Sequence, residues 1–198
     1  MKLIFISGPS GSGKTTLSNK LIKKNKNGFV LRTDNYYKTG LISKILSKFL
    51  EGFFDRSISF NYKLFKKDFD FICKHGISLN DRNYNFEKKT IQNVLNETNN
   101  ISFLIVEGIF AKEFANTLNN QNYFFLEIKT KKNKCMKRVV QRDSKERGKD
   151  KKQAENDFLK SWDIYYEKFK PNSINKNTNK FIIRKKTDVD LIMKKLFK

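Results

Sequence analysis

The fold is decided by the stretch Leu3-Ile-Phe-Ile-Ser-Gly-Pro-Ser-Gly-Ser-Gly-Lys-Thr15. Its first four residues are apolar and predict a buried strand. The loop that follows fits the pattern G-x-x-x-x-G-K-[S/T], and the segment from Thr16 to Ile22 predicts a helix. In a strand, loop and helix of this order, backbone N–H groups and the positive end of the helix face one anion. The stretch therefore predicts a phosphate-binding loop rather than a chance glycine-serine turn.

Each residue type in this loop has a physical role. Glycines let the backbone curl, so that successive N–H groups point at a phosphate. Lys14 brings a compact positive charge to the outer phosphates of a nucleotide, and the Thr15 hydroxyl suits Mg²⁺. The residues that we expect to bind the phosphates are Gly8, Ser10, Gly11, Ser12, Gly13, Lys14, Thr15 and Thr16.

Length and composition predict one globular domain. The chain has 198 residues, of which 38% are hydrophobic and 14% aromatic. No apolar run approaches the roughly 18 residues of a membrane helix, and a strand and phosphate loop stand where a signal peptide would be. Cys73 and Cys135 lack motif spacing, and a single histidine makes structural zinc improbable. We expect a cytoplasmic protein with reduced cysteines and no membrane partner.

The net charge of +22 raises the question of nucleic acid. Only seven of the 42 basic residues are arginine, so lysine supplies the other 35. Arginine is the better residue for forked phosphate and base contacts. Lysine, asparagine, isoleucine and phenylalanine are the residues that an AT-rich genome over-uses, so incidental charge is the favoured interpretation. Phosphate-rich ligands and nucleic acid remain the alternatives.

Two acidic residues follow predicted strands. Asp34 comes just after the strand predicted at 28–32, and Glu107 ends the strand predicted at 101–106. The carboxyl ends of parallel strands form the edge where open α/β sheets bind ligands. Asp34 is therefore a candidate base or metal ligand, the alternative being a turn residue that caps the next helix. Glu107 is a candidate carboxylate beside Mg²⁺, the alternative being a solvent-facing strand end.

Strands and helices alternate along the rest of the chain. This order predicts a mostly parallel sheet with helices on both faces. Segment 87–100 has no clear pattern, although its end at 96–100 is typical of a loop. The other predicted elements are helices at 41–50, 61–74, 131–141, 150–170 and 188–197, a strand or hairpin at 76–86, strands at 123–128 and 181–183, and a loop at 171–180.

Two arginines lie close to a predicted helix break at Gly148. Arg142 and Arg147 stand out because the chain otherwise uses lysine. Charge runs are usually solvated helix faces, but arginines beside a hinge are also typical of a lid that clamps phosphates. We predict such a lid at about residues 142–152.

Several of these stretches together resemble the uridine kinase and phosphoribulokinase-like group of P-loop kinases. The resemblance covers nearly the whole chain in the right order. The motifs that carry it are Gly8–Thr15, Asp34-Asn-Tyr-Tyr-Lys38, Tyr84-Asn-Phe86, Glu107-Gly-Ile109, Arg138-Val-Val-Gln-Arg-Asp-Ser-Lys-Glu-Arg-Gly148, and Tyr166 to Pro171 followed by Ile182-Ile183.

The resemblance implies a P-loop NTP hydrolase-type three-layer α/β sandwich with a small lid and an acceptor-site hairpin insertion at about 52–92. It also implies transfer of the γ-phosphoryl group of ATP, with Mg²⁺, to a small-molecule hydroxyl, typically the 5′-hydroxyl of a nucleoside. A homo-oligomer is implied by analogy. The site residues implied are Asp34, Lys14, Arg142 and Arg147 for catalysis, Thr15, Asp34 and Glu107 for the metal, and Asp34, Tyr37, Asn61, Tyr84 and Phe86 for the acceptor.

The departures from the family pattern fall mainly on the acceptor side. The family's Phe-Asp-His-Pro stretch is read here at 60–63, where Asn61 replaces the aspartate, and Tyr-Asp-Phe has become Tyr84-Asn-Phe86. A family histidine is missing, Val139 replaces an arginine, and Lys149 replaces another. These changes weaken the prediction that uridine is the acceptor more than they weaken the prediction that the protein is a kinase. Nicotinamide riboside, pantothenate and sugars remain alternative acceptors.

Two other classes of protein fit the sequence less well. A GTPase switch needs Asp-x-x-Gly and Asn-Lys-x-Asp, but the chain has Glu107-Gly108 and Asn133-Lys-Cys-Met136. A nucleic-acid-binding P-loop NTPase would use the charge, yet no helix-turn-helix, zinc or RNA-binding aromatic motif is present.

Overall fold

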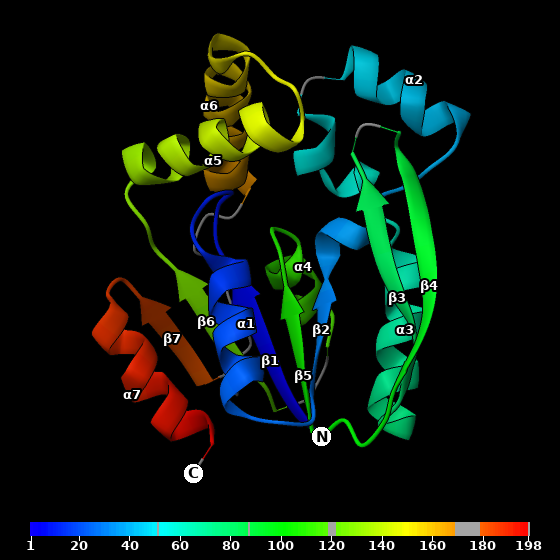
Figure 1. Ribbon diagram of the computed structural model, residues 1–198, viewed down its shortest axis with the longest axis vertical. Helices are drawn as coiled ribbons and strands as arrows, with labels where there is room; N and C mark the ends of the chain where they lie inside the picture. Colours follow the sequence, from blue (N-terminus) through cyan, green and yellow to red (C-terminus); the bar gives the residue numbers. More distant parts are fainter. Residues whose placement is uncertain (51, 87, 119–121, 169–178, 198) are drawn as a thin grey trace.

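The computed structural model describes residues 1–50, 52–86, 88–118, 122–168 and 179–197. Its centre is a five-stranded sheet with the order β2-β5-β1-β6-β7, and all neighbouring strands run parallel (Figure 1). This confirms the predicted α/β fold. The strands are β1 (Lys2–Ser7), β2 (Gly28–Arg32), β5 (Phe103–Glu107), β6 (Phe124–Ile128) and β7 (Asn179–Ile183).

The two central strands are buried on both faces. Every residue of β5 is buried, and so are Leu3 to Ser7 of β1. Parallel strands covered by helices on both sides carry continuous apolar runs instead of alternating ones. This is why the strands around 3–6 and 101–106 can be recognised from sequence.

Helices cover both faces of the sheet and make three layers. On one face, Ile4 and Ile6 pack against Leu17 and Leu21 of α1 and Leu196 of α7. On the other face, Phe5 packs with aromatic residues of α3 and α4. These helices are α1 (Lys14–Lys24), α3 (Tyr62–His75), α4 (Ala111–Asn116) and α7 (Lys186–Leu196).

An antiparallel hairpin forms a separate two-stranded sheet beside α3 (Figure 1). Its strands are β3 (Ser78–Asn85) and β4 (Thr90–Thr98). The strand predicted at 76–86 is confirmed. The loop predicted at 96–100 is wrong as far as Thr98, because β4 continues there. Most of β4 is exposed, so its stability comes from pairing with β3 and not from an apolar face that sequence could reveal.

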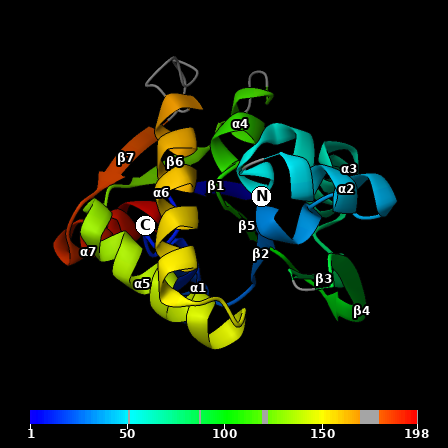
Figure 2. The same cartoon turned by 90° about the horizontal axis from the view of Figure 1, so that it is seen from above.

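Above the carboxyl edge of the sheet stand helices α5 (Lys132–Glu146) and α6 (Lys151–Lys168), joined by a short turn (Figures 1 and 2). In that turn Gly148 has φ 61°, a left-handed conformation that favours glycine. Across from them lie α2 (Leu41–Phe49) and the short 3₁₀ helices η2 (Phe53–Asp55) and η3 (Ser57–Ser59). The end of the predicted 150–170 helix and residues 171–178 of the predicted 171–180 loop lie outside the described residues, while the loop prediction is wrong at 179–180, where β7 begins. No helix within the described ranges is long and apolar enough to cross a membrane.

Candidate active site

The loop between β1 and α1 is folded tightly against α5. Gly11 and Gly13 have φ values of 74° and 102°. A Cβ atom on Gly11 would lie 2.6 Å from the Cys135 carbonyl oxygen and 2.9 Å from Val139 Cγ2. Arg138 Nη1 donates a hydrogen bond of 3.0 Å to the Gly11 carbonyl. Glycine is therefore needed at this position for both conformation and space.

Lys14 lies across the mouth of this loop. Its Nζ atom donates to the carbonyl oxygens of Gly8 (2.9 Å) and Pro9 (3.1 Å). Burial lowers the pKa of Lys14, while the negative charges of Asp34 and Glu107 oppose that shift. The ammonium group thus lies within electrostatic reach of both carboxylates named from the sequence.

Glu107 is buried at the end of β5, with 3% of its surface exposed. Thr15 Oγ1 donates to Glu107 Oε1 over 3.0 Å, and Arg32 Nε lies 3.3 Å from the same oxygen. Strand register aligns these groups, because Glu107 pairs with Ile6 of β1 and with Arg32 of β2. The solvent-facing alternative for Glu107 is therefore wrong.

This donor set suits a hard cation. Thr15 and Glu107 present hydroxyl and carboxylate oxygens beside the phosphate loop, and Mg²⁺ binds through one or two carboxylates plus phosphate oxygens. The described residues contain no cluster of three or more His, Cys, Asp or Glu that would form an all-protein cage. The residues present therefore fit a magnesium ion that arrives with a nucleotide.

We expect Arg32→Ala to raise the pKa of Glu107. Burial already raises the pKa of this carboxyl, and the charges of Lys14 and Arg32 act against that shift. Removing Arg32 deletes one of the opposing charges, so the protonated form should persist to higher pH. Carboxyl ¹³C chemical shifts across pH would measure this. Lys20→Ala, a surface change on α1, is the matched control, and an unmoved or lowered Glu107 titration in Arg32→Ala would contradict the assignment.

Asp34 lies in the 3₁₀ helix η1 (Thr33–Tyr36), directly after β2. Burial lowers the pKa of Lys14, and the charge of Asp34 opposes that shift; burial raises the pKa of Tyr37, and the charge of Asp34 adds to it. Asp34 lines the same cleft as Lys14 of the phosphate loop and the aromatic residue Tyr37. It does not cap the next helix, because the N-cap of α2 is Gly40.

Gly108 joins the end of β5 to η1 by close contact. Its φ is 143°, and a Cβ atom built on it would overlap the Thr33 hydroxyl and lie 2.9 Å from Thr33 Cβ. Glu107 and Asp34 are the chain neighbours of Gly108 and Thr33, the residues that approach each other here. This contact fixes the spacing of the acidic edge.

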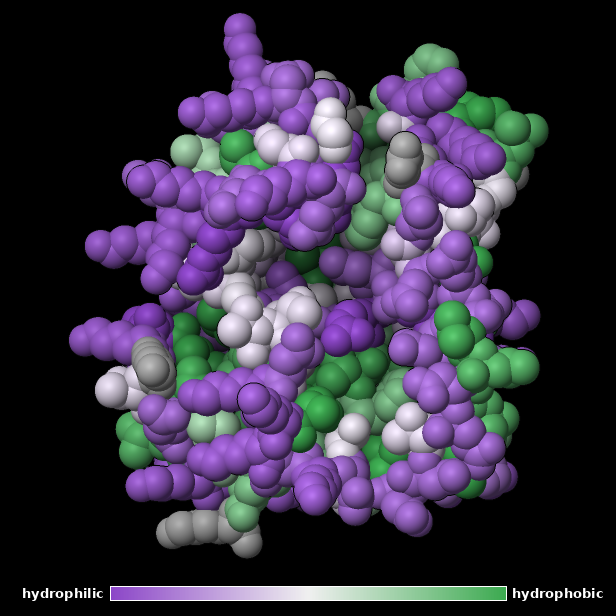
Figure 3. All heavy atoms as spheres, in the orientation of Figure 1, coloured by the Kyte–Doolittle hydropathy of each residue, from purple (hydrophilic) through white to green (hydrophobic). Residues whose placement is uncertain are grey.

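A cleft of about 830 Å³ opens at this edge of the sheet. It is lined by the phosphate loop, by Asp34 and Glu107, by residues of α5 and α6, and by the segment around η2. Figure 3 shows the hollow between the upper parts of the molecule, with hydrophilic side chains around most of its rim.

One wall of the cleft is aromatic. Tyr37 meets Phe54 and Phe86 edge to face, with ring centroids 5.1 and 5.6 Å apart. Tyr84 packs behind them, 5.2 Å from Tyr37 and 5.0 Å from Phe86, and is not among the residues that line the cleft. Its hydroxyl is buried without a hydrogen-bond partner among the described residues, and burial raises the pKa of Tyr84 to about 12. The structure therefore brings Tyr37 and Phe86 to the cleft and leaves Tyr84 one layer behind.

Asn61 is not at the cleft. It is the N-cap of α3, and its Oδ1 accepts a hydrogen bond from the Leu64 amide over 3.2 Å. The carboxylate that does line this side of the cleft is Asp55, which accepts a hydrogen bond of 2.7 Å from Ser161 Oγ. Sequence reasoning missed Asp55, although Phe54-Asp55 carries a Phe-Asp pair six residues before Phe60-Asn61.

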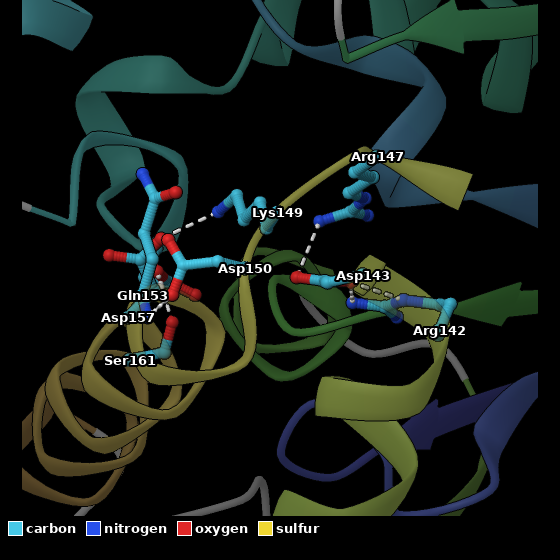
Figure 4. Close-up of polar contacts among 9 residues, drawn as sticks. Arg142, Asp143, Arg147, Lys149, Asp150, Gln153, Asp157 and Ser161 are labelled. Atoms are coloured by element: carbon cyan, nitrogen blue, oxygen red, sulfur yellow. Dashed lines mark hydrogen bonds and ion pairs between the residues drawn. The ribbon is translucent and has the colours of Figure 1, made fainter. Parts of the chain in front are cut away.

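Both arginines predicted for the lid reach the cleft. They flank Asp143, which is buried (Figure 4). The Arg147 guanidinium lies 4.1 Å from the centroid of the Phe86 ring. Lys149 Nζ donates to Asp157 Oδ2 over 2.6 Å, which ties the turn to α6. The roles of Arg32, Arg138 and Asp143 were not predicted from sequence, because nothing local to those residues shows what they contact.

Comparison with known proteins agrees with this geometry. The family described as "Phosphoribulokinase / Uridine kinase family" matches residues 3–196. A uridine kinase from Borrelia duttonii is 29% identical over 171 residues, which are 85% of this chain and 80% of that protein. A uridine kinase from Ureaplasma parvum serovar 3 is 28% identical over 152 residues, covering 74% of this chain and 71% of that protein.

Solved structures share the fold at lower identity. D-glycerate 3-kinase from Cryptococcus neoformans superposes with a TM-score of 0.62 at 12% identity, over 92% of this chain and 86% of that one. Deoxyadenosine kinase from M. mycoides with bound dATP gives a TM-score of 0.50 at 17% identity, over 100% of both chains. With the phosphate loop, the acidic edge and the family match over most of its length, the chain belongs to the phosphoribulokinase/uridine kinase family and is a P-loop kinase of small molecules.

Proposed function

We propose that this kinase transfers the γ-phosphoryl group of ATP to the 5′-hydroxyl of a nucleoside. The observation that carries the proposal is that Asp34 lines one cleft together with Lys14 of the phosphate loop and Tyr37 of the aromatic wall. Phosphoryl transfer needs a carboxylate at the acceptor hydroxyl and cations at the phosphates, and the two must face each other.

In this proposal the donor half of the cleft binds ATP. The glycine loop and Lys14 hold the β- and γ-phosphates, and Thr15, Asp34 and Glu107, which line the same cleft, would hold Mg²⁺ directly or through water. Bound Mg²⁺ would neutralise charge on the phosphates. Arg142 and Arg147 form part of a lid at about 142–152 and stabilise negative charge on the group in transfer.

The acceptor half suits an aromatic base joined to a sugar. Tyr37, Phe54 and Phe86 offer flat apolar surface for a base, with Arg147 beside Phe86. Asp55 lies in the same part of the cleft and is placed to accept hydrogen bonds from ribose hydroxyls. Pantothenate and simple sugars lack an aromatic ring for this wall, whereas nicotinamide riboside has one and is the alternative acceptor.

A phosphorylation assay with several acceptors tests the proposal. ATP and Mg²⁺ would be supplied with uridine, cytidine, nicotinamide riboside, pantothenate or glycerate, and product would be measured by mass. We expect turnover on a compound with an aromatic base and a ribose. Turnover on pantothenate or glycerate alone, or on none of the five despite ATP binding, would contradict the nucleoside assignment.

Asp55→Asn is expected to raise the KM for the acceptor. Hydrogen bonds to a charged group contribute about 1.5–3 kcal/mol, which corresponds to roughly tenfold to a hundredfold in KM. The KM for ATP should stay within about twofold, because Asp55 is on the acceptor side. Steady-state kinetics with each substrate varied in turn would measure the two KM values separately.

The matched control for Asp55→Asn is Asn61→Ala. Asn61 caps α3, so its loss should lower the free energy of unfolding by about 1 kcal/mol and leave both KM values unchanged. If Asn61→Ala raised the KM for the acceptor and Asp55→Asn did not, the acceptor assignment of Asp55 would be wrong.

A further inference from the structure

Asp143 is a buried carboxylate that the proposed reaction has not yet used. It is 4% exposed and lies on the same face of α5 as Cys135 and Val139. This face packs against the phosphate loop and α6. A charged side chain is seldom buried to this degree without partners. The identity of its partners therefore indicates what it does.

Both partners are the arginines at the cleft (Figure 4). Arg142 contacts Asp143 Oδ1 with Nε at 2.8 Å and with Nη2 at 2.7 Å. Arg147 Nη1 lies 3.5 Å from the other oxygen, Oδ2. One carboxylate thus contacts two guanidinium groups, one through each oxygen.

The main chain of Asp143 also supports the turn. Its carbonyl oxygen accepts the amide of Arg147 over 3.1 Å and the amide of Lys149 over 3.2 Å. Asp143 therefore contacts the end of α5, the turn at Gly148 and both arginine side chains.

Two guanidinium groups this close repel each other. The pKa of Arg147 is lowered first by burial and then by the charge of Arg142, and the charge of Asp143 opposes both. Without that negative charge the two side chains would move apart or turn to solvent. With it they stay together over the cleft, and Phe86 supports Arg147 from the acceptor side.

We propose that Asp143 is a positioning residue that holds Arg142 and Arg147 side by side, so that both meet the transferring phosphoryl group already oriented. The proposal rests on the proposed function in one respect, that these arginines act on that group. Its physical basis is preorganisation: cations fixed before the reaction need no reorientation while charge develops.

Asp143→Asn is expected to lower kcat roughly 100-fold, since displacing catalytic groups by about 1 Å can cost this much. The KM for ATP should change less than about threefold, because the glycine loop and Lys14 remain. Asp143→Glu keeps the charge and shifts it by one methylene. It should fold even where the asparagine variant is unstable, and lose less kcat than Asp143→Asn because both arginines keep a negative partner.

A double-mutant cycle separates positioning from simple structural support. In an Arg142→Ala/Arg147→Ala background, the same Asp143→Asn change should cost less than about twofold in kcat, because it has nothing left to position. Glu146→Gln is the matched control: it removes one negative charge from an exposed position three residues along α5 and should leave kcat unchanged. An equal loss from Asp143→Asn in both backgrounds would overturn the proposal.

A readout without an acceptor keeps this test separate from the nucleoside assignment. The Arg142 Nε–H is hydrogen-bonded in the structure, so its ¹⁵N-detected exchange with water should be slow in the wild type and fast in Asp143→Asn. If no acceptor is turned over, release of phosphate from ATP in the absence of an acceptor would be measured in its place. Fast Arg142 exchange with undiminished turnover would also overturn the proposal, whereas failure of every acceptor would leave the exchange result standing.

Discussion

Asp34→Asn is expected to bind ATP with wild-type affinity and to lose most of its turnover. The substitution keeps the size of the side chain and removes the group proposed to orient and deprotonate the acceptor hydroxyl. General base catalysis of this kind contributes about 10²–10⁴-fold, so kcat should fall by that factor. Rapid-quench measurement of product in a single turnover, together with ATP titration by calorimetry, would separate the chemical step from binding.

The pH of that comparison matters, because burial lowers the pKa of Lys14 and the charge of Asp34 opposes that shift. Removing Asp34 lowers that pKa further, so the variant should lose ATP affinity at a lower pH than the wild type. Binding should therefore be compared across a series of pH values, and the affinities of the two proteins should agree at the lower ones. Asp70→Asn on α3, an exposed carboxylate paired with Lys66, is the charge-matched control. Full turnover in Asp34→Asn would exclude Asp34 as the base.

Gly108→Ala should destabilise the protein and disturb both carboxylates of the site. At φ 143° an alanine is strained by about 1–3 kcal/mol, and its methyl group would overlap Thr33. Overpacking of this kind costs about a further 1–3 kcal/mol. We expect the free energy of unfolding to fall by about 2–6 kcal/mol in all, measured by urea denaturation.

Two companion variants identify the cause of that loss. Gly40→Ala also places alanine at a positive φ, 95°, but its methyl group would meet nothing within 4 Å, so it should show strain alone. Thr33→Ala combined with Gly108→Ala should recover part of the stability by removing the overlapping hydroxyl. If Gly40→Ala and Gly108→Ala lost equal stability, close packing of Gly108 on Thr33 would not be the reason.

The donor side of the site could be predicted because its signals are local. The phosphate loop is a continuous pattern, and Glu107 ends an apolar run that any covered parallel strand would show. Asp34 follows its strand in the same way. The sequence therefore places all three at one edge of the sheet before any side-chain contact is known.

The acceptor side could not be predicted to the same degree, because tertiary contacts determine which of its residues face the cleft. Asn61 and Asp55 both follow a phenylalanine, and only the start of α3 at Tyr62 makes Asn61 a cap and leaves Asp55 facing the cleft. Strand β4 likewise depends on β3 for its hydrogen bonds. Asp143 was visible inside a motif, but its partners could not be predicted: Arg142 lies beside it in α5, and Arg147 lies at the end of that helix, before the turn at Gly148.

The cross-strand row that joins Ile6, Glu107 and Arg32 has a consequence for how such an enzyme can change over time. These three positions are aligned by main-chain hydrogen bonds, which substitutions in surrounding loops do not alter. The aromatic wall and Asp55 belong instead to 3₁₀ turns and a hairpin outside that sheet. Mutation can therefore remodel what the cleft accepts while the phosphate-handling atoms keep their spacing. During evolution, one acceptor can therefore be exchanged for another without passing through variants that have lost the ability to activate ATP.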